Sequence, residues 1–341
     1  MVTTETMPPA VLRDLLEGAI GPDRAQRALA VLDLAYAPEQ PDPAQVSRAT
    51  VAIVLTTVLF SDLLQSVPTA SAYVGTVAAS GERVCFDHGA MRTVAGPSGA
   101  LPSGSAAFTR ILEPLGYEFA HAYPLPRLRM QGASYTSRDL PYGLPQFFLS
   151  ELQADLLGEE AQEAAARVFG ASHDPLGETE RALLGALARE GSCPAEDARA
   201  GLPGLARAFG VNHPTPTLSD YETLRADSTE AAWIATEGNR FNHATTRVGD
   251  VGALAERLRA EGWPIKEQLE VSRNGRVIQT AFIADKVMRP FRDRDGNLVD
   301  REVPGSFYEF IERRIDPATG KIDLTFDTAN ATGIFAVTSG T

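Results

Sequence analysis

The chain has 341 residues, of which 44% are apolar, so it can bury a substantial core and could hold two or three folding units. Its net charge of −13, without any run of lysine and arginine, argues against a surface that binds nucleic acid. Two cysteines, Cys85 and Cys193, are too few for a disulfide framework, and the N-terminus lacks a basic segment followed by an apolar one, so we expect a cytoplasmic protein.

The first part of the chain, residues 1–78, is predicted to form a helical layer that covers a sheet. Apolar residues recur at three- and four-residue spacing over 9–20 and 23–34, which is typical of helices that pack on one face. A longer apolar helix is expected over 44–67. Its uncharged run, 49–61, is shorter than the roughly 20 residues that a membrane span needs. We therefore predict a core helix and no membrane partner.

The next segment, residues 79–160, is predicted to form a unit of one strand, one helix and three further strands. The periodicity changes here from helical to alternating. The expected elements are a strand at 83–88, a helix at 105–115, and strands at 117–125, 128–133 and 145–152. An alanine-rich helical insert, residues 161–235, follows this first unit.

Residues 236–341 are predicted to repeat the same order of elements. The dipeptide Asn274-Gly275 favours the tight turn of a hairpin, and Asp295-Gly296-Asn297 marks a second turn. The expected elements are a strand at 240–248, a helix at 251–261, strands at 268–272, 277–283, 288–291 and 298–303, and a closing strand at 306–314. The sequence therefore predicts an α+β fold with two related units.

A short pattern occurs once in each predicted unit and supports a duplication. His88 and Arg92 form a His-x-x-x-Arg pattern on the first strand, and His243 and Arg247 form the same pattern in the second unit. Each pattern is followed by a helix that ends in glycine and an aromatic residue. The separation between His88 and Glu151 resembles that between His243 and Glu309, so Glu151 is the expected counterpart of Glu309.

The closing strand carries a glutamate, Glu309, among large apolar residues. A carboxylate is tolerated on a buried strand only when an arginine or a metal compensates its charge. His88 and His243 would complete a set of two histidines and one carboxylate, which is the ligand set of non-haem Fe(II) oxygen chemistry, although Mn, Zn and Ni accept the same ligands. Two other interpretations remain open: the histidines belong to the core, or Glu309 forms a buried ion pair with Arg92 or Arg247.

Three segments carry a resemblance to a known family: His88-Gly89-Ala90-Met91-Arg92, the closing strand over 307–313, and Gly333-Ile334-Phe335. Their order and spacing over about residues 45–337 resemble the 2-oxoadipate dioxygenase/decarboxylase family of the vicinal-oxygen-chelate superfamily. The resemblance implies that two βαβββ units form a curved sheet around a metal site.

The resemblance also implies an activity and a ligand set. Fe(II) would be held by His88, His243 and Glu309, and the partners would be a small 2-oxo acid and O2. The expected reaction converts 2-oxoadipate to 2-hydroxyglutarate with release of CO2. Arg92 would be the catalytic and substrate-binding arginine, since it shares a strand face with His88 and a guanidinium can grip a carboxylate through two hydrogen bonds. Ala329 and Asn330 are expected to contact the substrate.

Two alternatives use the same fold. A glyoxalase-like isomerase or lyase would hold Zn or Ni and needs a fourth ligand, for which Glu151 is the candidate. A non-catalytic protein that binds a small molecule would need no complete set of metal ligands. The sequence leaves the roles of Glu151 and Arg247 open.

Overall fold

The computed structural model describes residues 9–34, 36–38 and 42–327. Its first part is helical, as predicted, with α1 (Ala10–Ile20), α2 (Pro22–Val31), α3 (Arg48–Ser66) and α4 (Pro68–Ala79). The long helix begins later than expected, because β1 (Gln45–Ser47) precedes it and the Ser47 side chain accepts a hydrogen bond from the Thr50 backbone N–H. Pro68 then starts a separate helix, since proline suits a first helical position.

Helix α3 is long and apolar enough to cross a membrane, and it is the only such helix in the ranges that the structure describes. However, 78% of its most apolar window is buried inside the protein. Its apolar composition is therefore accounted for by packing against neighbouring helices and the sheet, in agreement with a core helix.

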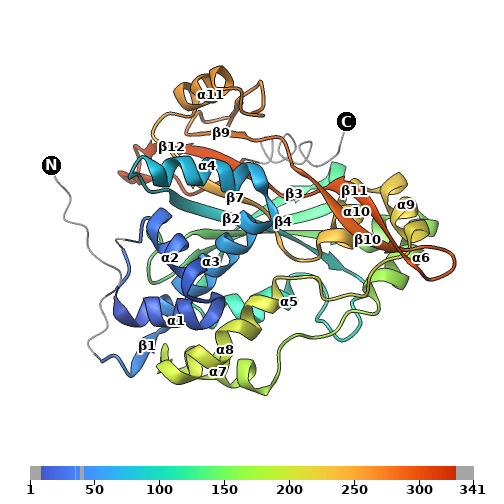
Figure 1. The fold of residues 1–341 in the computed structure, drawn as a ribbon, viewed down its shortest axis with the longest axis horizontal. Coiled ribbons are helices and arrows are strands. Elements are labelled where there is room, and N and C mark those ends of the chain that lie inside the picture. The colour runs from blue at the N-terminus through green and yellow to red at the C-terminus, as the bar shows by residue number, and fades with distance from the viewer. Residues whose placement is uncertain (1–8, 35, 39–41, 328–341) are drawn as a thin grey trace.

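A single curved sheet of eight strands forms the centre of the molecule, in the order β3-β4-β5-β2-β7-β12-β9-β8 (Figure 1). The first four in this order are β3 (Tyr117–Leu125), β4 (Met130–Ser137), β5 (Gln146–Gln153) and β2 (Cys85–Ala95). The other four are β7 (Phe241–Arg247), β12 (Phe307–Arg313), β9 (Val277–Ala281) and β8 (Glu270–Val271). With α5 (Ala106–Leu112) and α11 (Val251–Ala260), the two halves have the predicted βαβββ order, and the α+β fold is confirmed.

The two halves meet at the antiparallel pair β2 and β7, and their register is reciprocal. His88 on β2 pairs with Thr245 on β7, and His243 on β7 pairs with Ala90 on β2. The histidines therefore occupy equivalent positions, as the repeated pattern predicted.

The predicted equivalence of Glu151 and Glu309 is wrong. Thr245 and Ala90 are equivalent, because each lies two residues after the histidine of its strand. Glu309 on β12 pairs with Thr245, whereas the residue on β5 that pairs with Ala90 is Phe148. Glu151 lies three residues further along β5 and pairs with Thr93. Because side chains alternate between the faces of a strand, an offset of three residues also turns Glu151 to the opposite face.

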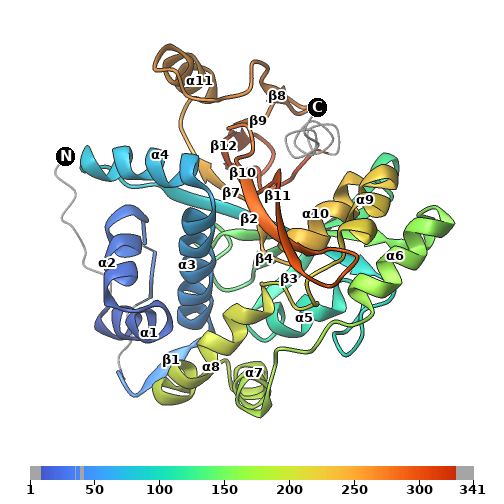
Figure 2. The same ribbon diagram turned by 45° about the vertical axis from the view of Figure 1, so that its right-hand side comes forward.

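The helical insert contains α6 (Glu159–Phe169), α7 (Glu178–Glu190), α8 (Ala195–Ala208), α9 (Leu218–Asp227) and α10 (Thr229–Glu237), with the short strand β6 (Ser192–Pro194) paired to β1. A separate hairpin, β10 (Lys286–Arg292) and β11 (Leu298–Pro304), lies beside α9 and α10 in both views (Figures 1 and 2). The ring centroids of Tyr221 on α9 and Phe291 on β10 are 4.7 Å apart, which joins the insert to the second unit.

The short pair β13 (Ile315–Asp316) and β14 (Lys321–Ile322) follows β12. The division at residues 78, 160 and 235 stays a prediction.

One face of the central sheet is covered by α3 and α4, and this sets the direction of Glu309. Tyr73 on α4 packs its ring against Tyr308 and Phe310 on β12, with centroids 5.7 Å and 4.9 Å apart. Burying each such aromatic side chain contributes roughly 1.5–3 kcal/mol. Because side chains alternate along a strand, Glu309 between them points to the other face, away from the helices.

Candidate metal centre

Three neighbouring strands bring the predicted ligands together. His88 on β2, His243 on β7 and Glu309 on β12 offer ligand atoms that all lie within 4.8 Å of one another. Their exposed fractions are only 2%, 6% and 0%. Among the residues described, this is the only group of three or more histidine, cysteine, aspartate or glutamate side chains with such geometry. The predicted triad therefore assembles, and it combines two imidazoles with one carboxylate.

Glu309 is held by hydrogen bonds as well as by the histidines. Its Oε2 lies 3.5 Å from Nε2 of both His88 and His243 and accepts a hydrogen bond from the Thr245 hydroxyl. The Gln279 amide donates to Oε1 at 3.0 Å. Burial alone would raise the pKa of Glu309, but the nearby His243 and His88 and the hydrogen bond from Thr245 lower it overall. The carboxylate is thus kept ionised, as a metal ligand must be.

A bulge in each central strand places a polar residue next to each histidine. On β2, Phe86 and His88 pair with Thr246 and Thr245, which are adjacent residues of β7. Asp87 is therefore the extra, bulged residue of β2. On β7 Asn242 is the extra residue in the same way, because His243 and Phe241 pair with adjacent residues of β2. Asp87 Oδ1 lies 2.9 Å from Nδ1 of His88, and Asn242 Nδ2 lies 3.1 Å from Nδ1 of His243. Each Nε2 faces Glu309, and that of His88 also lies 3.1 Å from the Thr245 hydroxyl oxygen.

The orientation of the Asn242 amide tests whether the residues fit a metal. Its Oδ1 is buried and has no hydrogen-bond partner among the residues that the structure describes, whereas its Nδ2 faces His243. Half a turn of the amide, whose oxygen and nitrogen have nearly the same shape, lets Oδ1 accept from an Nδ1–H of His243. That tautomer leaves the lone pair on Nε2 free for a cation, so the donor set fits a metal ion.

Asp87 is in turn clamped by two arginines. Arg313 on β12 donates to both carboxylate oxygens at 2.9–3.0 Å, and Arg247 on β7 donates to Oδ2 at 2.8 Å and 3.0 Å. Although burial opposes ionisation, Arg313, His88 and Arg247 together hold the pKa of Asp87 well below its ordinary value. Arg247 therefore has a structural partner and does not occupy the environment of Arg92.

Glu151 does not belong to the centre. Its carboxylate accepts hydrogen bonds from the backbone N–H of Ser105 and from the Gln153 amide. Both interactions fit its position on the opposite face of β5. The fourth ligand that the isomerase interpretation requires is therefore not supplied by this residue.

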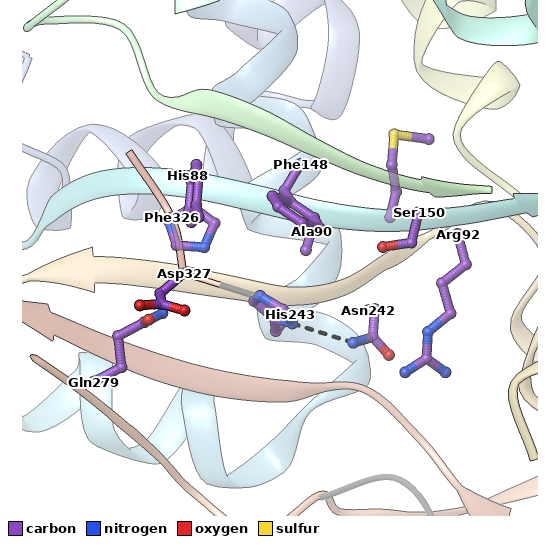
Figure 3. Close-up of a pocket in the computed structure, with 11 residues that line it drawn as sticks. His88, Ala90, Arg92, Phe148, Ser150, Asn242, His243, Gln279, Phe326 and Asp327 are labelled. Carbon is purple, nitrogen blue, oxygen red and sulfur yellow. Dashed lines mark hydrogen bonds between the residues drawn. The ribbon is translucent and has the colours of Figure 1, made fainter. Parts of the chain in front are cut away.

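A pocket lies over the histidines (Figure 3). Phe148 and Phe326 form apolar walls, and the ring of Phe326 meets that of His88 edge-on with centroids 4.8 Å apart. The segment that carries Phe326 is fixed by Arg313, whose Nη1 donates to the carbonyls of Asp323 and Thr325 at 3.0 Å and 2.8 Å.

Arg92 lines the same pocket as His88, as its position four residues further along β2 predicted. Its side chain is 1% exposed and forms an ion pair with Glu230 of α10, Nη1 to Oε2 at 2.8 Å. The guanidinium also lies over the ring of Trp233, 4.7 Å from the centroid. The expected substrate contacts Ala329 and Asn330 lie outside the described residues.

The residues around this centre that sequence reasoning missed include Asp87, Asn242, Gln279 and Glu230. A signal for the first two is present, because Phe-Asp-His at 86–88 and Phe-Asn-His at 241–243 extend the repeated pattern. Gln279 and Glu230 approach the site from other strands and from the insert, and no local pattern marks them.

The chain resembles known proteins along most of its length. A family model described as 2-oxoadipate dioxygenase/decarboxylase matches residues 57–335. The chloroplastic/amyloplastic 2-oxoadipate dioxygenase/decarboxylase of Oryza sativa is 24% identical over 255 residues, which cover 70% of this chain and 62% of the relative. The chloroplastic enzyme of Arabidopsis thaliana is 25% identical over 256 residues, which cover 69% and 60%. The matched region thus spans less than two thirds of these plant relatives.

Solved structures show the same fold. A glyoxalase-superfamily protein from Ralstonia eutropha JMP134 is 46% identical, with a TM-score of 0.89 over 93% of this chain and 98% of its own. The hydroxyglutarate synthase of Oryza sativa, solved in complex with 2-oxoadipate, is 21% identical, with a TM-score of 0.67 over 89% and 98%.

Proposed function

The chain belongs to the 2-oxoadipate dioxygenase/decarboxylase family, and from this membership we propose that it is an Fe(II)-dependent enzyme that oxidises and decarboxylates a 2-oxo dicarboxylic acid. With 2-oxoadipate and O2 as substrates, the products are 2-hydroxyglutarate and one CO2, which balances all atoms. The observation that supports this proposal most is the cluster of His88, His243 and Glu309, because both histidines also line a pocket together with Arg92.

The three ligands would hold Fe(II), which supplies the one-electron chemistry that O2 needs to react with an organic acid. Asp87 keeps the proton on Nδ1 of His88, so that Nε2 offers its lone pair to the centre. Thr245 and Gln279 hold the two oxygens of Glu309 in place. These contacts orient the ligands before any substrate arrives, which lowers the cost of assembling the site.

Substrate binding is assigned to the rest of the pocket. The Arg92 guanidinium binds a carboxylate of the acid, and its burial strengthens that attraction because little water competes. Phe148 and Phe326 exclude water from the space over the histidines. A dicarboxylic acid can then place one carboxylate and its keto group near the triad and its other carboxylate near Arg92.

The test is oxygen uptake by anaerobically purified, Fe(II)-loaded protein after addition of 2-oxoadipate. We expect O2 consumption with matching release of CO2 in the natural chain and none in His243→Ala, which removes a ligand. Absence of uptake with 2-oxoadipate and with other 2-oxo acids, although metal is bound, would overturn the proposal. Binding of the acid without any turnover would then favour a protein that only binds a small molecule.

A further inference from the structure

The side chain that faces Arg92 comes from outside the two βαβββ units. Glu230 lies in the first turn of α10, where Ser228 caps the helix, and its side chain is only 3% exposed. Trp233, one turn later on the same helix, packs its ring against the Arg92 guanidinium. The Asn239 amide donates to the Arg92 backbone carbonyl at 2.8 Å. The helical insert therefore fixes the side chain of Arg92, and the segment that follows α10 fixes its backbone.

The chemistry of this ion pair resembles that of a bound ligand. Glu230 places a carboxylate oxygen 2.8 Å from a guanidinium nitrogen, which is the pairing of charges that a carboxylic acid substrate would also make, although these two atoms do not meet in hydrogen-bonding geometry. Arg92 lines the pocket, whereas Glu230 is not among the residues that line it. Arg92 thus lies between an internal carboxylate and the space where a substrate carboxylate would bind.

This arrangement has an energetic consequence for substrates. A second carboxylate that reaches Arg92 comes within a few ångströms of Glu230, in a region that little water screens. The two like charges repel, and the positive charge of Arg92 is shared between them. An acid without a second carboxylate does not meet this repulsion.

We propose that Glu230 is a specificity-determining residue that competes with the substrate for Arg92 and so reduces the preference of the pocket for dicarboxylic over monocarboxylic 2-oxo acids. This inference rests on the proposed function, because it assumes that Arg92 receives the carboxylate remote from the keto group. It places control of substrate charge in the helical insert and outside the metal-binding strands.

The experiment compares Glu230→Gln with the natural chain. Glutamine keeps the size of the side chain and removes its charge. Calorimetry on Fe(II)-loaded protein without O2 measures the dissociation constants of 2-oxoadipate and of 2-oxohexanoate, which has the same carbon chain without the second carboxylate. We expect Glu230→Gln to tighten 2-oxoadipate on the order of tenfold, with little change for 2-oxohexanoate.

The matched control is Glu237→Gln on the same helix. Glu237 is also buried, at 1%, and Arg289 binds both its oxygens at 2.6 Å and 2.8 Å, but it does not line the pocket. This variant is expected to lower the unfolding temperature and to leave the ratio of the two dissociation constants unchanged. A role of Glu230 in stability alone would make both variants behave alike.

Glu230→Asp provides a second variant if Glu230→Gln does not fold. It keeps the charge but draws it back by one methylene, so a smaller shift in the same direction is expected. An unchanged ratio in the variant that folds, or equal weakening of both acids, overturns the inference, as does failure of the natural chain to bind either acid. If the acids bind and the ratio shifts but O2 is not consumed, the proposed function fails while the role of Glu230 stands.

Discussion

Asp87 and Asn242 occupy equivalent bulges in the two central strands, and each lies beside Nδ1 of the histidine that follows it. One of the two carries a charge and the other does not. The charge of Asp87 is matched by Arg247 and Arg313, whereas Asn242 has no such partners among the interactions described. The two halves of the sheet therefore support the same ligand type by different means.

Asp87→Asn is expected to weaken both the fold and the metal site. Removing the charge leaves Arg313 buried beside a neutral amide, and breaking such a pair typically costs about 3–5 kcal/mol. Loss of the hydrogen bond to a ligating histidine typically reduces metal affinity roughly 10–100-fold. Chemical denaturation and a metal titration measure the two effects.

Asn242→Ala is the matched variant, because it removes the partner of His243 without removing a charge. We expect a similar loss of metal affinity but a stability loss of only about 1 kcal/mol. Equal losses of stability in the two variants would contradict the asymmetry between the two bulges.

Glu309→Gln is expected to abolish metal binding, since an amide is a much poorer ligand than a carboxylate in a site with two neutral imidazoles. Glu151→Gln is its control, because the Glu151 carboxylate is occupied by Ser105 and Gln153. Metal content after loading and desalting distinguishes them. A loss of metal in Glu151→Gln would restore that residue as a ligand.

Arg92→Lys retains the positive charge opposite Glu230 but loses the planar fork that grips a carboxylate. We expect unchanged metal content and an increase in KM for 2-oxoadipate of roughly tenfold or more, which corresponds to the loss of about one charge-assisted hydrogen bond. Steady-state oxygen consumption measures KM. An increase of the same size for 2-oxohexanoate would show that Arg92 does not bind the remote carboxylate.

Glu270 on β8 gives the protein a pH-dependent stability. Burial raises its pKa to about 7, despite the ion pair with Lys266, compared with about 4.3 in an unfolded chain. The folded state favours the protonated form of Glu270, so the protonated side chain stabilises the fold relative to the ionised one. This stabilisation is fully present below pH ~4.3 and is lost as pH rises through about 7. We expect Glu270→Gln to remove this loss and to gain roughly 1–3 kcal/mol at pH 8.

Urea denaturation between pH 4.5 and pH 8 tests this effect, with Glu267→Gln at an exposed position nearby as the control. The difference in unfolding free energy between Glu270→Gln and the natural chain should grow with pH. A difference that stays constant over this range would contradict the assignment to Glu270.

The repeated pattern predicted the strands and the triad because its information is local. His88 and Arg92 are four residues apart on one strand, and His243 and Arg247 repeat that spacing, so alternation alone places them on one face. The element order followed from periodicity and from turns such as Asn274-Gly275, where Gly275 adopts a φ of +67°.

The errors and omissions have a common physical origin in strand register and tertiary contact. Similar spacing suggested that Glu151 corresponds to Glu309, but strand pairing assigns that place to Phe148, and nothing in the spacing distinguishes the two. Bulges place Asp87 and Asn242 beside the histidines, and spacing alone does not show which residue of a strand is bulged. Glu230 reaches Arg92 from a helix of the insert, so only the folded chain brings the two together.

The contact between Arg313 and Asp87 joins residues that are 226 positions apart, and this has a consequence for synthesis on the ribosome. The half-sheet that carries Asp87 and His88 emerges long before β7 can pair with it and before β12 can pair with β7. During that interval the edge of β2 is unpaired, and such edges are prone to aggregation. A nascent chain interrupted before β12 lacks Arg313, so Asp87 would have to be buried without its strongest cation or remain in water.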